Sequence, residues 1–171
     1  MAGILPFHLN EENDTLYYLI SRESHTHPTD AGLYSDFGGA KEKGETLLET
    51  ASREGYEESM GFFGKKSQIK KAISHKPVYM KLSFDNYTTF LYHIEYCPHL
   101  IRYMNYHFDF IKINAPSLID SKNSIYEKDH FMLQTLEELK ENKKIRPFYR
   151  NIIEQIDETS VKEYISTYST K

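Results

Sequence analysis

The segment Gly39–Gly61, with the sequence GAKEKGETLLETASREGYEESMG, carries the most specific pattern in this 171-residue chain. Counted from the first glycine, a glutamate stands six positions on, an Arg-Glu pair follows eight positions later, and two adjacent glutamates follow that pair. These residues are Glu45, Arg53, Glu54, Glu57 and Glu58. Several residue types at fixed offsets indicate a shared chemical task more strongly than a simple acidic run does.

A helix over Thr46–Ser59 would bring the three later glutamates together. Positions i, i+3 and i+4 share one helix face, so Glu54, Glu57 and Glu58 form one acidic cluster. Leu48, Ala51 and Gly55 fall on the adjoining arc, which predicts a narrow core-facing stripe. The acidic cluster is therefore expected at the margin of the buried face.

Clustered carboxylates repel one another unless a cation neutralises them. Magnesium prefers oxygen ligands and retains waters beside phosphate-bearing substrates, so the acidic cluster suits a divalent ion. Arg53 lies next to the cluster, where a guanidinium can orient a carboxylate by paired hydrogen bonds. The alternative is a solvated acidic helix face, which Gly39 and Glu45 at fixed offsets argue against.

The pattern resembles the Nudix box, Gly-x5-Glu-x7-Arg-Glu-U-x-Glu-Glu-x-Gly-U, in which U is a bulky aliphatic residue. The resemblance implies a Mg²⁺- or Mn²⁺-dependent hydrolase of phosphoanhydride compounds, commonly a nucleoside diphosphate joined to another group. It implies that Glu54, Glu57 and Glu58 hold the metal and that the Gly39 carbonyl completes the site. Arg53 and Glu45 are expected to brace the acidic cluster.

Two positions depart from the Nudix box. Gly55 replaces its aliphatic residue, and Met60 occupies the position of its last glycine, with Gly61 one residue late. A glycine inside a helix costs about 1 kcal/mol of helix stability relative to alanine. We expect this glycine to let the helix approach a sheet closely, which would offset the cost. All of the expected metal-binding positions are retained.

An additional acid is expected late in the chain, as in many Nudix proteins, acting as base or metal ligand. We favour Glu127 over Asp129 for this role, and a solvated loop charge is the alternative. The segments YEKDHFMLQTLEEL and KIRPFYR, at 126–139 and 144–150, are loosely similar to late segments of Nudix proteins from large DNA viruses and some eukaryotes.

Several cationic residues flank the box. Lys41 and Lys43, within its loop, are the candidates for substrate phosphate binding. A basic cluster follows the box; its members are Lys65, Lys66, Lys70 and Lys71. We favour solvated helix charges for this cluster over a site for additional phosphates or a ribonucleotide backbone. His25 and His27 are interpreted as an exposed loop pair rather than as metal ligands.

Composition places the chain among soluble globular proteins of one domain, residues 1–171, with a helical C-terminal segment at about 145–171. The net charge of −4 argues against a broadly basic nucleic-acid surface. Cys97 has no partner for an internal disulfide, which fits a cytoplasmic location, and we predict a buried thiol in an apolar strand. No apolar run approaches membrane-spanning length.

Alternation and breaker residues predict the remaining elements. Strands are expected over Gly3–Leu9 and Thr15–Ser21, a hairpin over 78–96, and a short strand over Phe131–Leu133. Helices are expected at Lys66–His75, His99–Ile113, Leu136–Glu141 and from Phe148 to Ile156, the last continuing through Val161 to Ile165. The predicted fold class is α/β: a mixed sheet sandwiched by helices, which is also the Nudix architecture.

The resulting hypothesis is a Nudix pyrophosphohydrolase. Its candidate substrates are an mRNA cap, a dinucleoside polyphosphate, a nucleoside triphosphate, a nucleotide sugar or a diphosphoinositol polyphosphate. One alternative is a catalytically weak module that binds nucleotide or RNA on the same fold, which Met60 favours. Another is an acidic structural protein with a coincidental match. The sequence indicates neither the substrate among these nor the oligomeric state.

Overall fold

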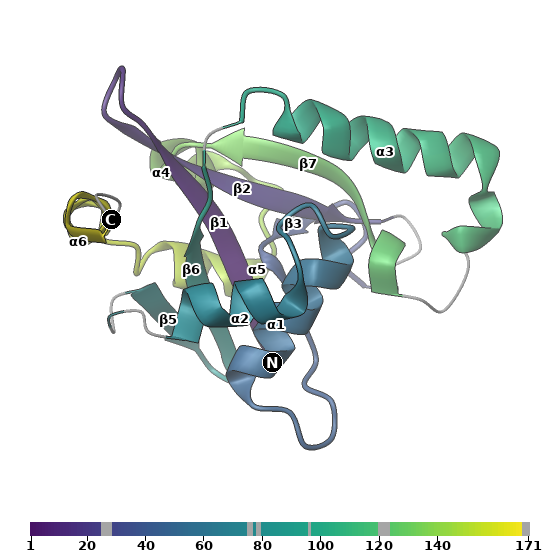
Figure 1. Ribbon diagram of the computed structural model, residues 1–171, viewed down its shortest axis with the longest axis horizontal. Coiled ribbons are helices and arrows are strands. Elements are labelled where there is room, and N and C mark those ends of the chain that lie inside the picture. The colour runs from purple at the N-terminus through teal and green to yellow at the C-terminus, as the bar shows by residue number, and fades with distance from the viewer. Residues whose placement is uncertain (25–28, 75–76, 78–79, 96, 120–123, 169–171) are drawn as a thin grey trace.

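A computed structural model describes residues 1–24, 29–74, 77, 80–95, 97–119 and 124–168 of the chain. His25 and His27, the last residue of the predicted helix at His75, and the ends of the predicted hairpin at Val78 and Tyr96 lie outside the described residues. The frame is a seven-stranded mixed sheet in the order β3-β2-β1-β6-β5, with β4 paired to β1 and β7 paired to β2 (Figure 1). β1 and β6 are parallel, and the other named pairs are antiparallel.

The strands follow the hydrophobic alternation of the sequence. Their bounds are β1 Ala2–Asn10, β2 Thr15–Glu23, β3 Tyr34–Ser35, β4 Phe37–Gly39, β5 Lys81–Phe84, β6 Tyr87–His93 and β7 Lys128–Gln134. The two N-terminal strands and the β5–β6 hairpin are thereby confirmed. β7 is longer than the predicted Phe131–Leu133 strand because it pairs with β2 along most of its length.

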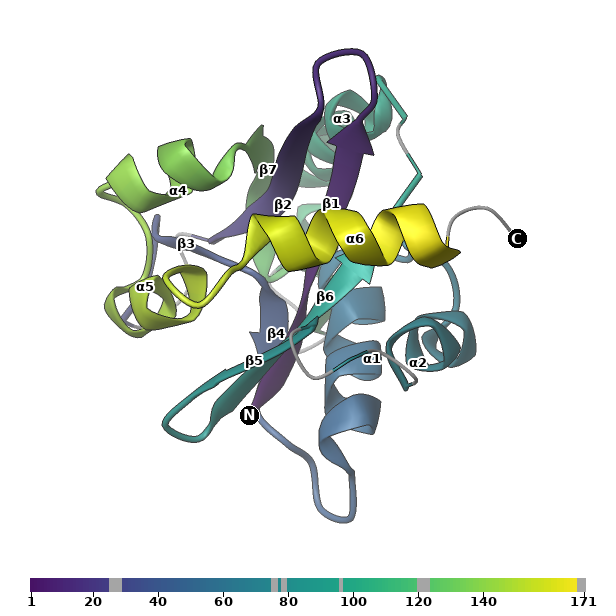
Figure 2. The same cartoon turned by 90° about the vertical axis from the view of Figure 1, so that its left-hand side faces the viewer.

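Helices cover both faces of the sheet, which confirms the predicted α/β/α sandwich (Figure 2). Their bounds are α1 Leu47–Glu58, α2 Lys66–Ser74, α3 Leu100–Asn114, α4 Leu136–Glu141, α5 Pro147–Ile153 and α6 Glu158–Tyr168, with short 3-10 turns at Pro116–Leu118 and Ser124–Tyr126. Ile4 of β1 belongs to the core with α1, α2 and α3, whereas its neighbour Leu5 belongs to the core with α4, α5 and α6. Adjacent residues on a strand point to opposite faces, so β1 is buried on both sides.

Two sequence predictions are wrong. Cys97 is exposed and lies beyond the end of β6 at His93, because the chain leaves the sheet there on its way to α3. The helix predicted to continue from Phe148 through Ile165 is broken into α5 and α6. Asp157 accepts hydrogen bonds from the backbone of Thr159 at 3.1 Å and from the Ser160 hydroxyl at 2.6 Å. Asp157 thus caps a new helix instead of extending the old one.

Gly55 lets α1 approach β1 closely, as the sequence suggested. A Cβ at this position would lie 2.5 Å from Ile4 Cδ1 and 2.9 Å from Ile4 Cγ1. Both residues are buried, so no side chain of ordinary size fits between the helix and the strand. The aliphatic residue of the box is absent here because Ile4 fills its space.

We therefore expect Gly55→Ala to destabilise the protein despite its better helix propensity. Overpacking costs about 1–3 kcal/mol, and the gain in propensity offsets about 1 kcal/mol of that. Urea unfolding should show a net loss of up to about 2 kcal/mol. In an Ile4→Val background, which lacks the Cδ1 atom, the same substitution should cost less; an equal cost in both backgrounds would contradict the close contact.

Met60 takes the backbone conformation that a glycine would take at the end of α1. Its φ is +55°, and Gly61 follows with φ +78°. The Met60 amide donates to Glu57 O at 2.9 Å and the Gly61 amide donates to Tyr56 O at 2.8 Å, the paired bonds of a Schellman helix end. The departure from the box therefore leaves the exit turn of the helix intact, at the cost of a non-glycine left-handed residue.

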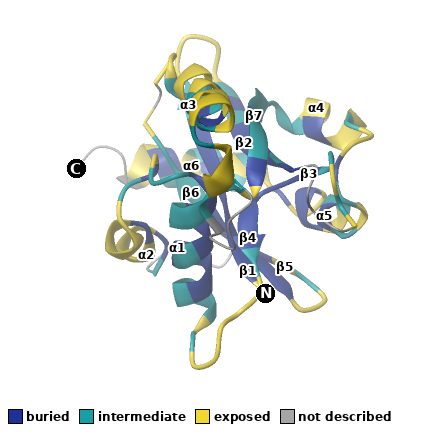
Figure 3. Cartoon of the chain, turned by 90° about the vertical axis from the view of Figure 1, so that its right-hand side faces the viewer, coloured by how far each residue is buried: buried dark blue, intermediate teal, exposed yellow. Residues whose placement is uncertain are grey.

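No helix in the described part of the chain is long and apolar enough to cross a bilayer. Figure 3 shows that the outward surface of α3 is largely exposed, whereas α1 is buried along the side that meets the sheet.

Candidate active site

The start of α1 is fixed by a capping box. The Thr46 hydroxyl accepts from the Glu49 amide at 3.3 Å, and the Glu49 carboxylate accepts from the Thr46 amide at 2.8 Å. These reciprocal bonds satisfy two free amides and set the phase of the helix. Glu54 consequently lies against Gly39 of β4, and both Glu54 and Glu58 are buried.

Gly39 lies directly against the first glutamate of the acidic cluster. It is the last residue of β4 and pairs with Ala2 of β1. A Cβ on Gly39 would stand 2.5 Å from Glu54 Oε1. A side chain at this position would displace the Glu54 carboxylate, which the backbone of Gly39 borders.

Arg53 joins the parts of the box that are separated in sequence. Its guanidinium donates to both Glu45 oxygens at 2.8 and 3.2 Å, to Glu54 Oε1 at 2.9 Å, to Glu57 Oε2 at 3.2 Å and to Ala40 O at 2.9 Å. The hydrogen bond from Arg53 is the main reason that the pKa of Glu45 falls to about 2. Arg53 thus lies beside the acidic cluster, as the sequence predicted, and Glu45 contacts the cluster through Arg53.

Glu54 and Glu58 are buried, whereas Glu57 is partly exposed. The Glu54 side chain is 7% exposed, and burial raises its pKa to about 7 against the opposing charge of Arg53. Glu57 pairs with Lys66 of α2 at 2.6 Å. The predicted position at the margin of the buried helix face is correct for Glu57, whereas the tertiary fold buries Glu54 and Glu58.

The buried charge of Glu58 is met by a lysine that the sequence analysis missed. Lys128 of β7 is fully buried; its ammonium lies 3.2 Å from Glu58 Oε1 and also donates to Glu23 of β2. Arg146 donates to the same Glu23 oxygen at 3.0 Å and to Asp30 at 2.5 Å. The pairing of β2 with β7 places Glu23 opposite Lys128, although the two residues are far apart in the sequence. No local sequence pattern predicts this contact.

The pKa values of this buried pair follow from burial and from the neighbouring charges. Burial raises the pKa of Glu58 well above its ordinary value, and the positive charge of Lys128 opposes that rise. Burial alone would lower the pKa of Lys128, but Glu58 and Glu23 together outweigh it and raise the pKa. Lys128 is therefore a stable buried cation.

A second missed group is Asp36, which is fully buried behind the glycines. Tyr87 and Thr89 each donate to its carboxylate at 2.7 Å. Burial raises its pKa to about 6 against these two hydrogen bonds. Gly3 and Gly38 are packed against the Tyr87 hydroxyl, so this network explains why both positions lack a side chain.

These elements enclose a cavity of about 460 Å³, which we call the site cavity. It is lined by carboxylates, glycines, one arginine and two aromatic rings. The lining residues are Met1, Glu23, Gly38, Gly39, Ala40, Glu54, Glu58, Tyr87, Glu127, Arg146 and Phe148. Residues from both ends of the Nudix-like pattern and from the late segment 126–150 therefore meet at one cavity.

The two late acids have different surroundings. Glu127 is exposed and lines the site cavity, and its charge contributes to the raised pKa values of Glu54 and Glu58. Asp129 is held at 2.6 Å by Arg22 and does not line the cavity. This geometry places Glu127, and not Asp129, beside the acidic cluster.

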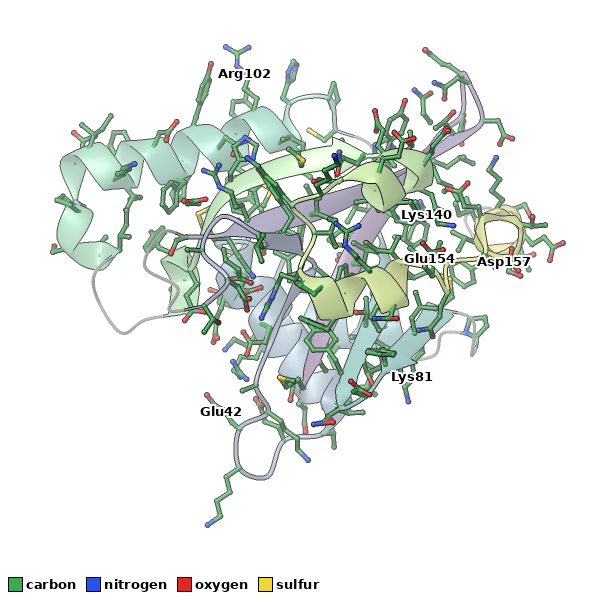
Figure 4. The ribbon with its side chains drawn as sticks, turned by 180° about the vertical axis from the view of Figure 1, so that it is seen from behind. Glu42, Lys81, Arg102, Lys140, Glu154 and Asp157 are labelled. Carbon is green, nitrogen blue, oxygen red and sulfur yellow. The ribbon has the colours of Figure 1, made fainter. Side chains whose placement is uncertain are left out.

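The predicted phosphate-binding lysines are not brought to the site cavity. Lys41 and Lys43 are exposed in the loop between β4 and α1, and Glu42 between them lies on the part of this loop that projects from the body of the molecule (Figure 4). Two members of the basic cluster pair with acids of α1: Lys66 with Glu57 and Lys70 with Glu49, the latter at 3.0 Å.

The residues around the acidic cluster fit a divalent cation. Glu58 Oε2 is buried with no hydrogen-bond partner in the described part of the chain, and Gly39 leaves space beside Glu54. Carboxylate and carbonyl oxygens are the ligands that Mg²⁺ and Mn²⁺ prefer. Among the described residues, no three Asp, Glu, His or Cys side chains are close enough together to form a metal-binding group. Arg53 and Lys128 contact the carboxylates instead.

The raised pKa of Glu54 predicts a pH dependence of stability. The folded state binds this proton more tightly than the unfolded chain, so the free energy of unfolding should fall as pH rises from 4.5 to about 7. In EDTA, wild type should lose about 3 kcal/mol more over this range than Glu54→Gln does. Urea titrations at pH 4.5, 6 and 7.5 measure the difference; parallel curves for the two proteins would contradict it.

Comparison with known proteins gives structural neighbours only. No protein-family profile matches the chain, and no curated protein sequence matches it. The likeness of the late segments to viral Nudix proteins therefore stays a prediction.

Three solved structures share the architecture over nearly their whole length. A MutT protein from Methanosarcina mazei Go1 is 18% identical, covers 94% of each chain and has a TM-score of 0.50. A mutT/nudix family protein from Listeria innocua is 13% identical over 96% of this chain and 94% of its own, with a TM-score of 0.51. A C. elegans Ap4A hydrolase is 11% identical over 98% of this chain and 97% of its own, with a TM-score of 0.51. The chain therefore has the Nudix-type α/β/α fold.

Proposed function

We propose that this protein is a divalent-metal-dependent Nudix pyrophosphohydrolase acting in the cytoplasm on a nucleotide-type or otherwise highly phosphorylated substrate. The observation that carries the proposal is the buried pair Glu54 and Glu58 in the wall of the site cavity, with one Glu58 oxygen unpartnered. Arg53 contacts one Glu54 oxygen and Lys128 contacts one Glu58 oxygen, which leaves the buried Oε2 atom of Glu58 available to a divalent ion. The Nudix-type fold supports the same chemistry.

In this proposal, Glu54, Glu58 and the carbonyl of Gly39 hold Mg²⁺ or Mn²⁺, and Glu57 completes the set from the partly exposed side. When bound, the ion supplies a Lewis acid for the phosphoryl oxygens and a more acidic water. Arg53 fixes the orientation of Glu54 and Glu57 by donating one hydrogen bond to each. It is itself fixed by its two bonds to Glu45.

Glu127 is the proposed base. It lines the same cavity as Glu54 and Glu58, and no other late acid of the described chain does. The attacking water forms a bond to phosphorus and passes a proton to the Glu127 carboxylate. The bridging P–O bond breaks on the opposite side, and the leaving phosphate takes the electron pair.

The substrate would enter a cavity whose other wall is aromatic and cationic. Phe148 and Tyr87 lie with ring centroids 5.1 Å apart, and the Arg146 guanidinium lies 5.0 Å from the Phe148 ring. These groups offer stacking and a positive charge to a phosphorylated ligand. Lys41 and Lys43 remain candidates for phosphates that extend beyond the cavity.

A substrate panel tests the proposal. Nucleotide or phosphate release would be measured with Mg²⁺, with Mn²⁺ and with EDTA, using capped RNA, dinucleoside polyphosphates, nucleoside triphosphates, nucleotide sugars and a diphosphoinositol polyphosphate. Metal-dependent release from one class, lost in Glu57→Gln, would support the enzyme and identify its substrate. No release from any class would contradict it, and metal binding without turnover would favour the nucleotide- or RNA-binding module.

A further inference from the structure

Lys128 is the most deeply buried cation of the site. Its side chain has 0% exposure, and its ammonium contacts Glu23 and Glu58, each 3% exposed. A lysine with a four-carbon flexible stem is seldom buried unless its charge is fully used. The contact of the Lys128 ammonium with two buried carboxylates therefore suggests a role for Lys128 besides linking β2 to β7.

The charges around the site cavity are divided between two sides. Arg53 donates hydrogen bonds to Glu45, Glu54 and Glu57, and it makes no hydrogen bond to Glu58 or Glu23. Lys128 donates a hydrogen bond to Glu23 and forms an ion pair with one oxygen of Glu58, the Oε1 atom.

Glu23 is doubly engaged, because Arg146 also donates to its Oε1 atom at 3.0 Å. Glu58 Oε2, in contrast, has no hydrogen-bond partner in the described part of the protein. Two cations therefore neutralise Glu23 through one of its oxygens, whereas Glu58 has one cation and a buried oxygen without a hydrogen-bond partner.

We propose that Lys128 is a built-in counter-ion that occupies the Glu23 side of the acidic site and thereby confines the divalent ion to Glu54 and the free oxygen of Glu58. The idea rests on the proposed function for the existence of a metal site. Lys128 is a positioning residue: it orients Glu58 through Oε1 and lowers the negative charge available to metal. Glu23 belongs to the cavity wall but ligates no metal while Lys128 is present.

Manganese binding tests the inference without reference to turnover. Wild type, Lys128→Met and Lys162→Met would be titrated with Mn²⁺ and followed by electron paramagnetic resonance of the free ion. Lys162 is the matched control, since it pairs with Asp14 at 2.7 Å on the surface. We expect about tenfold tighter binding in Lys128→Met, because metal affinity follows ligand charge, and no change in Lys162→Met.

A second readout is thermal. Lys128→Met should melt below wild type in EDTA, because Glu58 and Glu23 lose a buried counter-ion, and Mn²⁺ should raise its melting temperature more than that of wild type. Equal or weaker Mn²⁺ binding in Lys128→Met than in wild type would overturn the inference. A lysine that only joins the two strands would lower the melting temperature equally with and without metal.

The double variant Glu23→Gln/Lys128→Met keeps the test decisive if the single variant does not fold. It removes both charges of a buried pair and leaves Glu54 and Glu58 intact, a change that proteins often tolerate. We expect its Mn²⁺ affinity to equal or exceed that of wild type. Weaker binding would mean that Glu23 is itself a ligand and would overturn the inference, whereas turnover by the wild type would still support the proposed function.

Discussion

Replacing Glu58 by glutamine should lower turnover about 1,000-fold while leaving the protein folded. The side chain is 3% exposed and one of its oxygens lies 3.2 Å from the Lys128 ammonium, so the isosteric amide fits the same space. It removes the negative charge that the proposed metal requires, and such charge stabilisation contributes several kcal/mol to the transition state. Initial rates on the best substrate of the panel, at saturating Mn²⁺, give the ratio of the two kcat values.

Glu154→Gln is the control for this change. Glu154 follows the last residue of α5, is exposed and pairs with Lys140 at 3.3 Å (Figure 4), and it does not line the site cavity. It should retain the activity of wild type. Circular dichroism should be alike for all three proteins, and a Glu58→Gln protein with more than a tenth of the normal kcat would contradict the assigned role.

Arg53→Met should damage both stability and turnover. The guanidinium makes hydrogen bonds to three carboxylates and to the Ala40 carbonyl, and its side chain is only 12% exposed. Its removal leaves Glu45, Glu54 and Glu57 without their shared cation, which should cost about 2–4 kcal/mol of unfolding free energy. Misplaced ligands should also lower kcat about 100-fold. Urea unfolding and steady-state kinetics measure the two effects.

Arg53→Lys separates charge from geometry. Lysine keeps the positive charge but cannot reproduce the fork that reaches Glu45, Glu54 and Glu57 together. We expect it to recover part of the lost stability and little of the lost kcat. Full recovery of kcat by lysine would mean that charge alone matters and that the bracing geometry is unimportant.

Much of the architecture was predictable because it is local. The alternation of apolar residues predicted β1, β2 and the β5–β6 hairpin, and the helix expected over Thr46–Ser59 matches α1 within one residue at each end. The close approach at Gly55 was also foreseeable, since a helix-interior glycine needs a compensating contact. Fixed spacing within Gly39–Gly61 similarly brought the acidic cluster and Arg53 together.

The rest depends on tertiary contacts that leave no local trace. Lys128 resembles an ordinary strand-edge charge in the sequence, yet β2–β7 pairing buries it against Glu23 and Glu58. Asp36 is likewise an unremarkable loop acid until Tyr87 and Thr89 of β6 enclose it. The difference between Glu127 and Asp129 also emerges only when Arg22 on β2 pairs with the latter.

The wrong predictions have the same origin. Cys97 follows an apolar stretch that periodicity alone extends beyond His93, where the chain actually turns toward α3. The spacing of apolar residues is compatible with one long helix after Phe148. The capping bonds of Asp157 instead begin α6 in a new direction across the sheet (Figure 2).

The central claim is that this site hydrolyses a phosphoanhydride with a divalent ion held by Glu54, Glu57 and Glu58. The most direct measurement is the rate of nucleotide release by wild type as Mn²⁺ is titrated from zero at fixed substrate concentration. The account predicts no release in EDTA and a saturable rise with Mn²⁺. A rate that is already maximal in EDTA, or that stays at zero at every Mn²⁺ concentration for every substrate class, would contradict it.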